Sequence, residues 1–465
     1  MLRHMLGYRT LFTLLLLVVA MGVVSRATAQ DDDDDTSTPA LAGVMVDAEG
    51  VLRKRVIADP SGLLRRQRIE AARASLDPDV AARSKLRKVS LTRLERELMR
   101  NQAVPTDTMR YLAGLQRVQY IFFYPESGDI VVAGPAEGWV VDPTDRVVGI
   151  HNGRPTLQLQ DLVVALRAFP PAGKETQLIA CSIDPTAEGL VRFQQFHAQL
   201  SRQYSANPNI PTEAILEGTR QSLGRHDVTI TGISPETHFA QVLVEADYRM
   251  KLIGIGMERP PVRLASYVER ARASDIAGNA MQRWYFVPDY QCVRVTDDGL
   301  AAELVGDGVK LVGEDEVVGS DGARHKAARG NRASQSFVNS FTQNYSMLAA
   351  RSPVFAELRN LIDLAVVAAL IQQEDYYERA GWDLGILGRE EVFKVETYPA
   401  PKMVDTAVTA HWKGGQLVTP VGGGVRIEPN MALDSENVIT DKADRVEKVR
   451  QQVVPKLAEG QWWWD

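Results

Sequence analysis

The stretch that decides the fold is Ser352-Pro-Val-Phe-Ala-Glu-Leu-Arg-Asn-Leu-Ile-Asp-Leu-Ala-Val-Val-Ala-Ala-Leu-Ile371. Its apolar residues recur at helical spacing and form a broad face from Val354 to Ala369. The Ser352-Pro353 pair is typical of a helix start, because proline suits the first turn. The most apolar part, residues 361–371, is shorter than the ~20 residues of a membrane span and contains Asp363. We therefore expect a buried core helix.

The sequence on either side of this stretch predicts both short helices and short strands. Period-two apolar runs bounded by Gly, Pro and Asp predict strands, and runs with a 3.6-residue period predict helices. The predicted strands are 42–56 (a hairpin), 118–141 (a meander), 227–233, 240–246, 250–257, 282–287, 291–296, 309–312 and 407–427 (a last hairpin). The predicted helices are 59–76, 78–101, 158–169, 185–204, 211–223, 262–273 and 337–348. The fold class is therefore α+β and multi-domain, with short mixed or antiparallel sheets and packed helices.

Changes of composition divide the chain into segments. We expect a signal peptide at 1–29, an acidic disordered tail at 30–40, a basic hairpin-plus-helices region at 41–110, αβ units at 111–205 and 206–316, a mobile loop at 317–334, a helical region at 335–400, and a hairpin with a C-terminal tail at 401–465.

The N-terminus is typical of export. Arg3 and Arg9 precede an apolar run at 11–24, and the small residues Ala27 and Ala29 follow it. The run is shorter than the ~20 residues of a spanning helix, which favours a cleaved signal peptide over a retained anchor. We expect cleavage after Ala29, no integral membrane segment in the mature chain, and residence in the periplasm or outside the cell.

The net charge limits the classes of partner that the protein can bind. The mature chain would carry 50 basic and 59 acidic residues, a net charge of −9, which argues against a nucleic-acid-binding protein. Residues 53–100 are an exception, with 14 Lys and Arg against six Asp and Glu. They are either a dock for a protein or an anionic envelope partner, or a solvated helical face. The acidic run 31–35 is interpreted as part of a solvated tail.

The two cysteines and the final tryptophans of the mature sequence each allow two interpretations. Cys181 and Cys292 lie in strand-like runs, and they either form the disulfide that export permits or remain as two buried thiols. Trp462, Trp463 and Trp464 close the sequence, and they either fold back onto the protein or bind something. The sequence does not set the oligomeric state.

Motifs of catalysis are missing from the sequence. No His-Glu-x-x-His, Gly-x-Ser-x-Gly or Ser-x-x-Lys occurs, and the glycines at 422–424 lack the Lys of a phosphate loop and are interpreted as a turn. We therefore predict no catalytic, metal or cofactor-binding residues and no cofactor. A pair of carboxylates, as in glycosidases, has no sequence signature and stays open.

Three charged residues within an apolar run suggest a binding site. Asp247, Arg249 and Lys251 alternate along a strand-like run, which would place all three on one face. There they would pair with each other, bind a ligand, or face solvent.

Two families resemble parts of the chain. Residues 147–155, 160–166 and 176–180 resemble the strand, Asn-Gly turn, helix and final strand of bacterial PDZ modules, which bind peptide termini, but no Gly-apolar-Gly-apolar loop precedes them. Residues 181–190, 246–256, 283–288, 341–345 and 353–359 resemble blocks of an exported planctomycete-type family of unknown function, spanning about 115–372. That resemblance implies envelope or extracellular residence and no particular activity.

The sequence therefore favours an exported protein that binds or assembles in the cell envelope without catalysis. The alternative is a hydrolase acting on an envelope or extracellular polymer. An enzyme should show a cleft with clustered, pKa-perturbed groups, whereas a binding module should show an exposed strand edge or an apolar patch.

Overall fold

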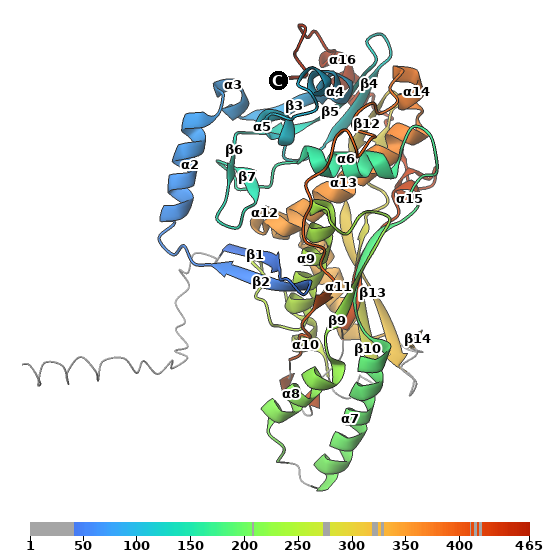
Figure 1. The fold of residues 1–465 in the computed structure, drawn as a ribbon. Helices are drawn as coiled ribbons and strands as arrows, with labels where there is room; N and C mark the ends of the chain where they lie inside the picture. Colours follow the sequence, from blue (N-terminus) through green and yellow to red (C-terminus); the bar gives the residue numbers. More distant parts are fainter. Residues whose placement is uncertain are drawn as a thin grey trace, which may run out of the picture. The chain divides into compact units, whose positions relative to one another are not determined.

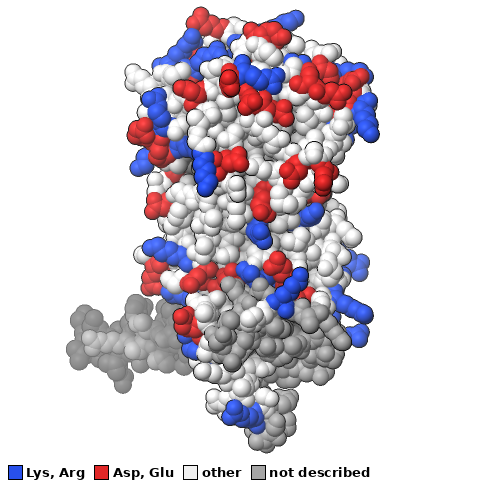
Figure 2. All heavy atoms as spheres, turned by 90° about the vertical axis from the view of Figure 1, so that its right-hand side faces the viewer, with Lys and Arg blue, Asp and Glu red and all other residues white. Residues whose placement is uncertain are grey.

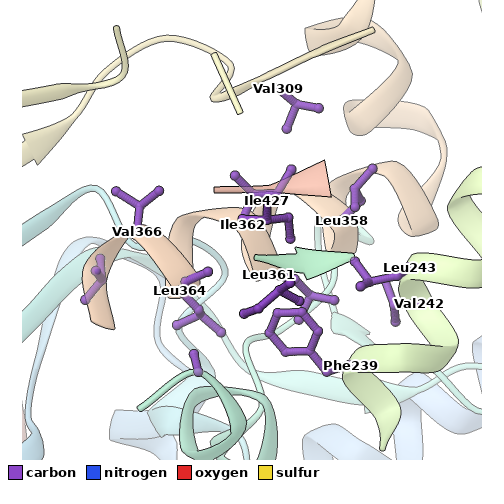
Figure 3. Packing of buried hydrophobic residues seen from close by; sticks show 14 of the residues in the cluster. Phe239, Val242, Leu243, Val309, Leu358, Leu361, Ile362, Leu364, Val366 and Ile427 are labelled. Atoms are coloured by element: carbon purple, nitrogen blue, oxygen red, sulfur yellow. The ribbon is translucent and has the colours of Figure 1, made fainter. Parts of the chain in front are cut away.

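Helix α13 (Pro353–Gln373) forms the centre of the core in the computed structural model of the protein. From Val354 to Ile371 every residue except Arg359 is buried, as expected for a helix that is apolar all round. In the part of the chain that the structure describes, five other helices pack against it, namely α6 (Leu159–Ala168), α9 (His238–Gly254), α12 (Tyr345–Arg351), α14 (Tyr376–Ala380) and α15 (Pro429–Leu433) (Figure 1). Figure 3 shows Leu358, Leu361 and Ile362 of α13 beside side chains of α9. The predicted buried helix is confirmed.

The structure describes residues 41–206, 209–272, 280–318, 324–326, 330–409, 411–412, 416–417 and 421–465. They belong to one compact unit, Ala40–Asp465. The fold class is α+β with mixed sheets, as predicted. The segment boundaries proposed above stay predictions.

The larger sheet has nine strands in the order β1-β2-β15-β9-β8-β18-β10-β13-β14. Neighbours are antiparallel except for β2 with β15 and β10 with β18. The bounds are β1 Leu41–Val46, β2 Val51–Ile57, β15 Met403–Val404, β9 His226–Thr231, β8 Ile179–Pro185, β18 Val421–Ile427, β10 Ala280–Pro288, β13 Val309–Val318 and β14 Arg324–Lys326. Helix α9 packs against β8 and β18, and α11 (Arg332–Gln343) packs against β13. The hairpin predicted at 42–56 is confirmed as β1 and β2.

The glycines at 422–424 lie in strand β18 and not in a turn, so that prediction was wrong. A Cβ on Gly423 would lie 2.0 Å from the Trp284 carbonyl oxygen, and one on Gly424 would lie 1.8 Å from that of Cys181. Only glycine allows the neighbouring strands β10 and β8 to approach this closely. The run of glycines therefore serves close packing inside the sheet.

The smaller sheet has seven strands in the order β19-β11-β12-β4-β5-β3-β20. The bounds are β19 Ile439–Thr440, β11 Val293–Val295, β12 Ala301–Leu304, β4 Tyr120–Tyr124, β5 Asp129–Ala136, β3 Ser84–Ser90 and β20 Trp463–Trp464. Phe122 and Tyr124 of β4 pack with Val446 of helix α16 (Arg445–Gln452), whereas Ile121 and Phe123 join the main core. Both faces of β4 are covered, which explains why its residues are apolar without alternation.

Several predictions of local structure were wrong. The helix predicted at 78–101 is divided into α3 (Pro78–Ala81), strand β3 and α4 (Leu91–Arg100). The strands predicted at 240–246 and 250–257 lie mostly in helix α9, which is buried on nearly all sides, so its apolar run mimics that of a buried strand. The helix predicted at 262–273 is reduced to α10 (Tyr267–Arg270). Of the segment 317–334, the described residues include strand β14 and the start of α11, and the mobility of this segment stays a prediction.

The predicted last hairpin and the PDZ-like segment each differ in part from the structure. The last hairpin is partly confirmed: β16 (His411–Trp412) pairs with β17 (Gln416–Leu417), whereas β18 joins the large sheet. The PDZ-like strands do not share a sheet, because β7 (Val147–Gly149) pairs with β6 (Trp139–Val141) and β8 belongs to the large sheet. The other helices are α2 Leu63–Ser75, α5 Asp107–Arg110, α7 Ala187–Ala206 and α8 Thr212–Leu223.

The C-terminal tryptophans fold back onto the smaller sheet. Trp463 and Trp464 form β20, which pairs with β3. The fully buried Arg87 guanidinium lies 4.7 Å from the centre of the Trp463 ring and donates two hydrogen bonds of 2.8 Å to the Asp465 carboxylate. Of the two alternatives for this tail, the structure therefore has the first.

Seven of the 14 basic residues of 53–100 form ion pairs with acidic residues of the same chain, in the part that the structure describes. Lys54 lies 2.8 Å from the Glu258 carboxylate, and Arg93 lies 2.8 Å from Asp129. Figure 2 shows Lys and Arg interspersed with Asp and Glu on the face it draws, outside its grey region. These ion pairs give many of the basic residues a structural role, and a dock for an anionic partner stays a prediction. In the parts of the chain described, each helix is too short or too polar to cross a bilayer.

Candidate functional site

A cavity of about 510 Å³ opens beside the N-terminal turn of α9. Its volume falls within the range of about 300–1,000 Å³ that is typical of small-molecule sites. Its walls come from segments far apart in the sequence, namely hairpin β1–β2, residues 103–111, the β6–β7 hairpin, the start of α6, α9, α13 and the extended segment 393–398.

His238 of this wall is paired with Asp161, which does not itself line the cavity. His238 is the first residue of α9, whose N-terminus is capped by the Thr237 hydroxyl, and Asp161 lies in the first turn of α6. The His238 Nδ1 atom lies 2.8 Å from an Asp161 carboxylate oxygen. Burial alone would lower the pKa of His238, but the charge and hydrogen bond of Asp161 outweigh it and raise this pKa to about 9. The imidazole is therefore a cation at neutral pH.

A buried arginine between two carboxylates forms the floor next to this pair. Arg146 directly precedes β7, and its backbone N–H is held at 3.1 Å by the Asp142 carboxylate of the preceding turn. Its guanidinium contacts Glu357 of α13 at 3.0 Å and also contacts Glu245 of α9. Burial raises the pKa of Glu357, against the lowering effect of the charges of Arg146 and His238. Arg146 carries one positive charge against two carboxylates, and the Arg249 guanidinium, 3.4 Å from Glu245, supplies a second positive charge beside them.

Aromatic and amide groups complete the lining. The Tyr398 hydroxyl accepts a 3.1 Å hydrogen bond from the Gln160 amide and donates one of 3.1 Å to Glu396. The Tyr398 ring lies 5.6 Å from the His238 ring, centre to centre. Tyr111, Phe393, Gln158 and Gln241 also line the cavity. The wall thus combines apolar rings with groups that both donate and accept hydrogen bonds.

Two kinds of catalytic arrangement are not found among the described residues. No hydroxyl or thiol there hydrogen-bonds to His238, whose Nε2 atom lies 3.4 Å from the Gln158 amide nitrogen. Nor do three or more His, Cys, Asp or Glu side chains in that part of the chain gather as metal ligands. His238 is therefore a cation held in the wall by Asp161, and the described residues place beside it no nucleophile of the kind that an Asp–His–Ser arrangement requires.

The polar residues predicted as a site lie elsewhere. Asp247, Arg249 and Lys251 lie on helix α9, not on a strand, so the common face that we expected does not form. Asp247 and Lys251 are buried and 2.8 Å apart, and Lys251 also donates to the Ile183 and Gly423 carbonyls of the sheet at 2.8 and 3.1 Å.

This buried pair is a structural link between α9 and the sheet. Arg249 lies 2.7 Å from Glu258 and 3.4 Å from Glu245, which lines the cavity. Burial raises the pKa of Asp247 to about 6, against the lowering effect of Lys251. Asp247, Arg249 and Lys251 do not themselves line the cavity.

The cysteines are buried and free in the structure. Cys181 lies on β8 of the larger sheet, whereas Cys292 directly precedes β11 of the smaller sheet. Burial raises the pKa of the Cys292 thiol to about 12 and also raises that of Cys181. The predicted cleavage after Ala29 and the acidic run 31–35 lie outside the described residues.

Sequence reasoning missed the cavity residues because they are scattered along the chain from Gly43 to Tyr398. One signal was present. Asp161, Glu245 and Glu357 each interrupt an apolar run of a helix, where a charged residue is costly unless it has a buried partner. Such interruptions mark buried polar contacts, but they do not reveal which of them meet.

One family model matches part of the chain. Residues 181–267 match the family described as "Protein of unknown function (DUF1598)". The match begins in β8, includes α7, α8 and β9, and ends in α10, so it contains His238 and Glu245 of the cavity. It includes the resembling blocks 181–190 and 246–256 and excludes 283–288 and 341–345. No curated protein and no solved structure matches the chain.

Proposed function

We propose that this is an exported protein of the cell envelope that binds a small polar ligand in the cavity beside His238. The observation that carries the proposal is a cavity of about 510 Å³ whose wall places buried ion pairs next to aromatic rings. A concave site with few convergent polar groups is what ligand recognition requires.

Binding is favoured over catalysis by the way in which the charges are held. His238 is tied to Asp161, and Arg146 is tied to Glu245 and Glu357. A general base must release and take up protons near neutral pH, whereas a histidine with a pKa of about 9 stays protonated there. Groups fixed in this way orient a ligand and exclude the wrong one.

The binding proposal is tested by filling the cavity. Gln241→Trp places a large ring on a lining residue of α9, and Gln67→Trp makes the same change on the exposed surface of α2. A panel of sugars, amino acids, dicarboxylates and nucleosides is screened by native mass spectrometry. Binding by the wild type and the Gln67→Trp variant, and loss in Gln241→Trp, supports the proposal. Equal binding by all three proteins places the ligand elsewhere.

Export is proposed from the N-terminal sequence, with its basic start, apolar run and paired alanines. The test is N-terminal sequencing of protein recovered from fractionated cells. A mature chain beginning at Gln30 in the periplasm or medium supports export. A retained Met1 in the cytoplasm refutes it.

Hydrolysis is the second candidate, and one observation favours it. Glu357 has a raised pKa and shares the Arg146 guanidinium with Glu245 on the cavity wall, and two carboxylates in a polar pocket are the machinery of glycosidases. Turnover of a glycan that disappears in Glu357→Gln, while binding persists, would establish this candidate. Binding without turnover in the wild type excludes it for the glycans tested.

A further inference from the structure

We infer that the ligand of this cavity is a neutral, hydroxyl-rich molecule, a sugar unit or a short glycan segment. The inference rests on the proposed binding function and names its ligand class. Three properties of the wall lead to it: closed ion pairs, mixed hydrogen-bonding groups and aromatic rings.

The ion pairs disfavour a charged ligand. The buried ion pairs are His238 with Asp161 and Arg146 with Glu245 and Glu357. Two further ion pairs lie at the rim, where Arg55 lies 3.3 Å from Asp145 and Arg110 lies 2.7 Å from Glu396. Among the described residues, Lys394 is the one charged lining group without an ion pair, and it is exposed to solvent. A charged ligand placed next to the buried pairs would have to compete with one of their partners, which is costly. A neutral ligand adds no charge and leaves every pair intact.

The hydrogen-bonding groups suit hydroxyls. Gln158 and Gln241 line the cavity with amides. The Gln160 amide donates both of its N–H groups to Gln158 and Tyr398, and its buried Oε1 atom has no hydrogen-bond partner among the described residues. The carboxylates of Glu357 and Glu396 have more lone pairs than their internal partners use. A hydroxyl donates one hydrogen bond and accepts two, so it fits between an amide and a carboxylate in either order. A ligand with several hydroxyls on one small frame satisfies such a wall best.

The aromatic residues supply the apolar side. Tyr398 and Tyr111 are half-buried and line the cavity with Phe393. The Tyr398 ring is held by its hydroxyl between Gln160 and Glu396, so its position is set before a ligand enters. A sugar ring has an apolar C–H face and a polar hydroxyl edge, and an amphipathic ring beside amides matches both.

The test uses probes that differ in charge at constant shape. Glucose, glucuronate and glucosamine, and neutral against acidic glycans on an array, are titrated against the full mature chain by calorimetry. Neutral probes should bind about tenfold or more tightly than their charged counterparts. Tyr398→Ala should weaken binding about tenfold, Tyr398→Phe should keep it within a few-fold because the ring remains, and Gln241→Trp should abolish it.

The failures of the two proposals differ. Tighter binding of a charged probe, abolished by Gln241→Trp, overturns the neutral ligand class and leaves the binding site in place. Sugar binding unchanged in Gln241→Trp and Tyr398→Ala overturns the assignment of sugar to this cavity. Absence of sugar binding overturns the ligand class, and absence of any cavity-dependent binding in the wider panel overturns the proposed function itself.

Discussion

Replacing Asp161 with asparagine should remove a pH-dependent part of the stability of this protein. In the wild type the carboxylate lies 2.8 Å from His238 and holds a proton on the ring, whose pKa is raised from 6.5 to about 9. Because one pKa unit corresponds to about 1.36 kcal/mol, this rise contributes roughly 3 kcal/mol to the unfolding free energy.

The sign follows from proton binding. The folded state holds the proton more tightly than the unfolded state, so the contribution is fully present below pH 6.5 and is lost as the pH rises to about 9. The wild type should therefore lose roughly 3 kcal/mol more than Asp161→Asn over this window. His238→Gln, which removes the titrating ring, should flatten the profile in the same way.

Urea unfolding between pH 5.5 and 10 measures the effect, and NMR titration of the His238 ring measures its pKa directly. Asp145→Asn is the matched control, because Asp145 is a carboxylate on the same cavity rim that contacts Arg55 and no histidine. The control should keep the wild-type profile. A His238 pKa near 6.5, or equal pH profiles for wild type and Asp161→Asn, would refute the reasoning.

Three further outcomes are expected. The wild type should lose stability as the pH rises from about 4 to about 6, because burial raises the pKa of the Asp247 carboxyl in the folded state. Asp247→Asn should remove this pH dependence. An equal pH dependence of the unfolding free energy in the wild type and the variant would contradict the prediction. Gly423→Ala should cost about 4 kcal/mol or more, whereas Gly173→Ala, also at positive φ but in open space, should cost about 1–2 kcal/mol; equal costs would show that the close approach to β10 does not matter. Cys181 and Cys292 should both be alkylated in denaturant without reductant and neither rapidly in the folded protein; mass spectrometry that finds them protected in denaturant would show a disulfide.

Local pattern was sufficient for much of the fold. The apolar face of α13, the hairpin β1–β2 and the helices α6, α7 and α8 were predictable because each carries its own periodicity or turn residues within a short window. Prediction of secondary structure from such short windows failed where a segment is buried on all sides. In α9 the apolar run has no polar face, so neither a helical nor a strand period stands out.

The candidate site could not be predicted, because its residues meet only in the folded chain. His238 and Asp161 are 77 residues apart, and Arg146 is 211 residues from Glu357. Each has an ordinary local context, and the sequence shows only that a charge interrupts an apolar run. Which charges pair is settled by how α6, α9 and α13 pack and by where the β6–β7 hairpin places Arg146.

The sequence alone therefore determines which segments must be buried, because burial depends on composition and spacing along the chain. It also shows that Asp161, Glu245 and Glu357 lie among apolar residues, and burial of an isolated charge there would be too costly to keep. Only the tertiary structure decides which partners these charges have. Electrostatic interactions act through space over a few ångströms, and the chain brings such groups together only when its helices and sheets have packed.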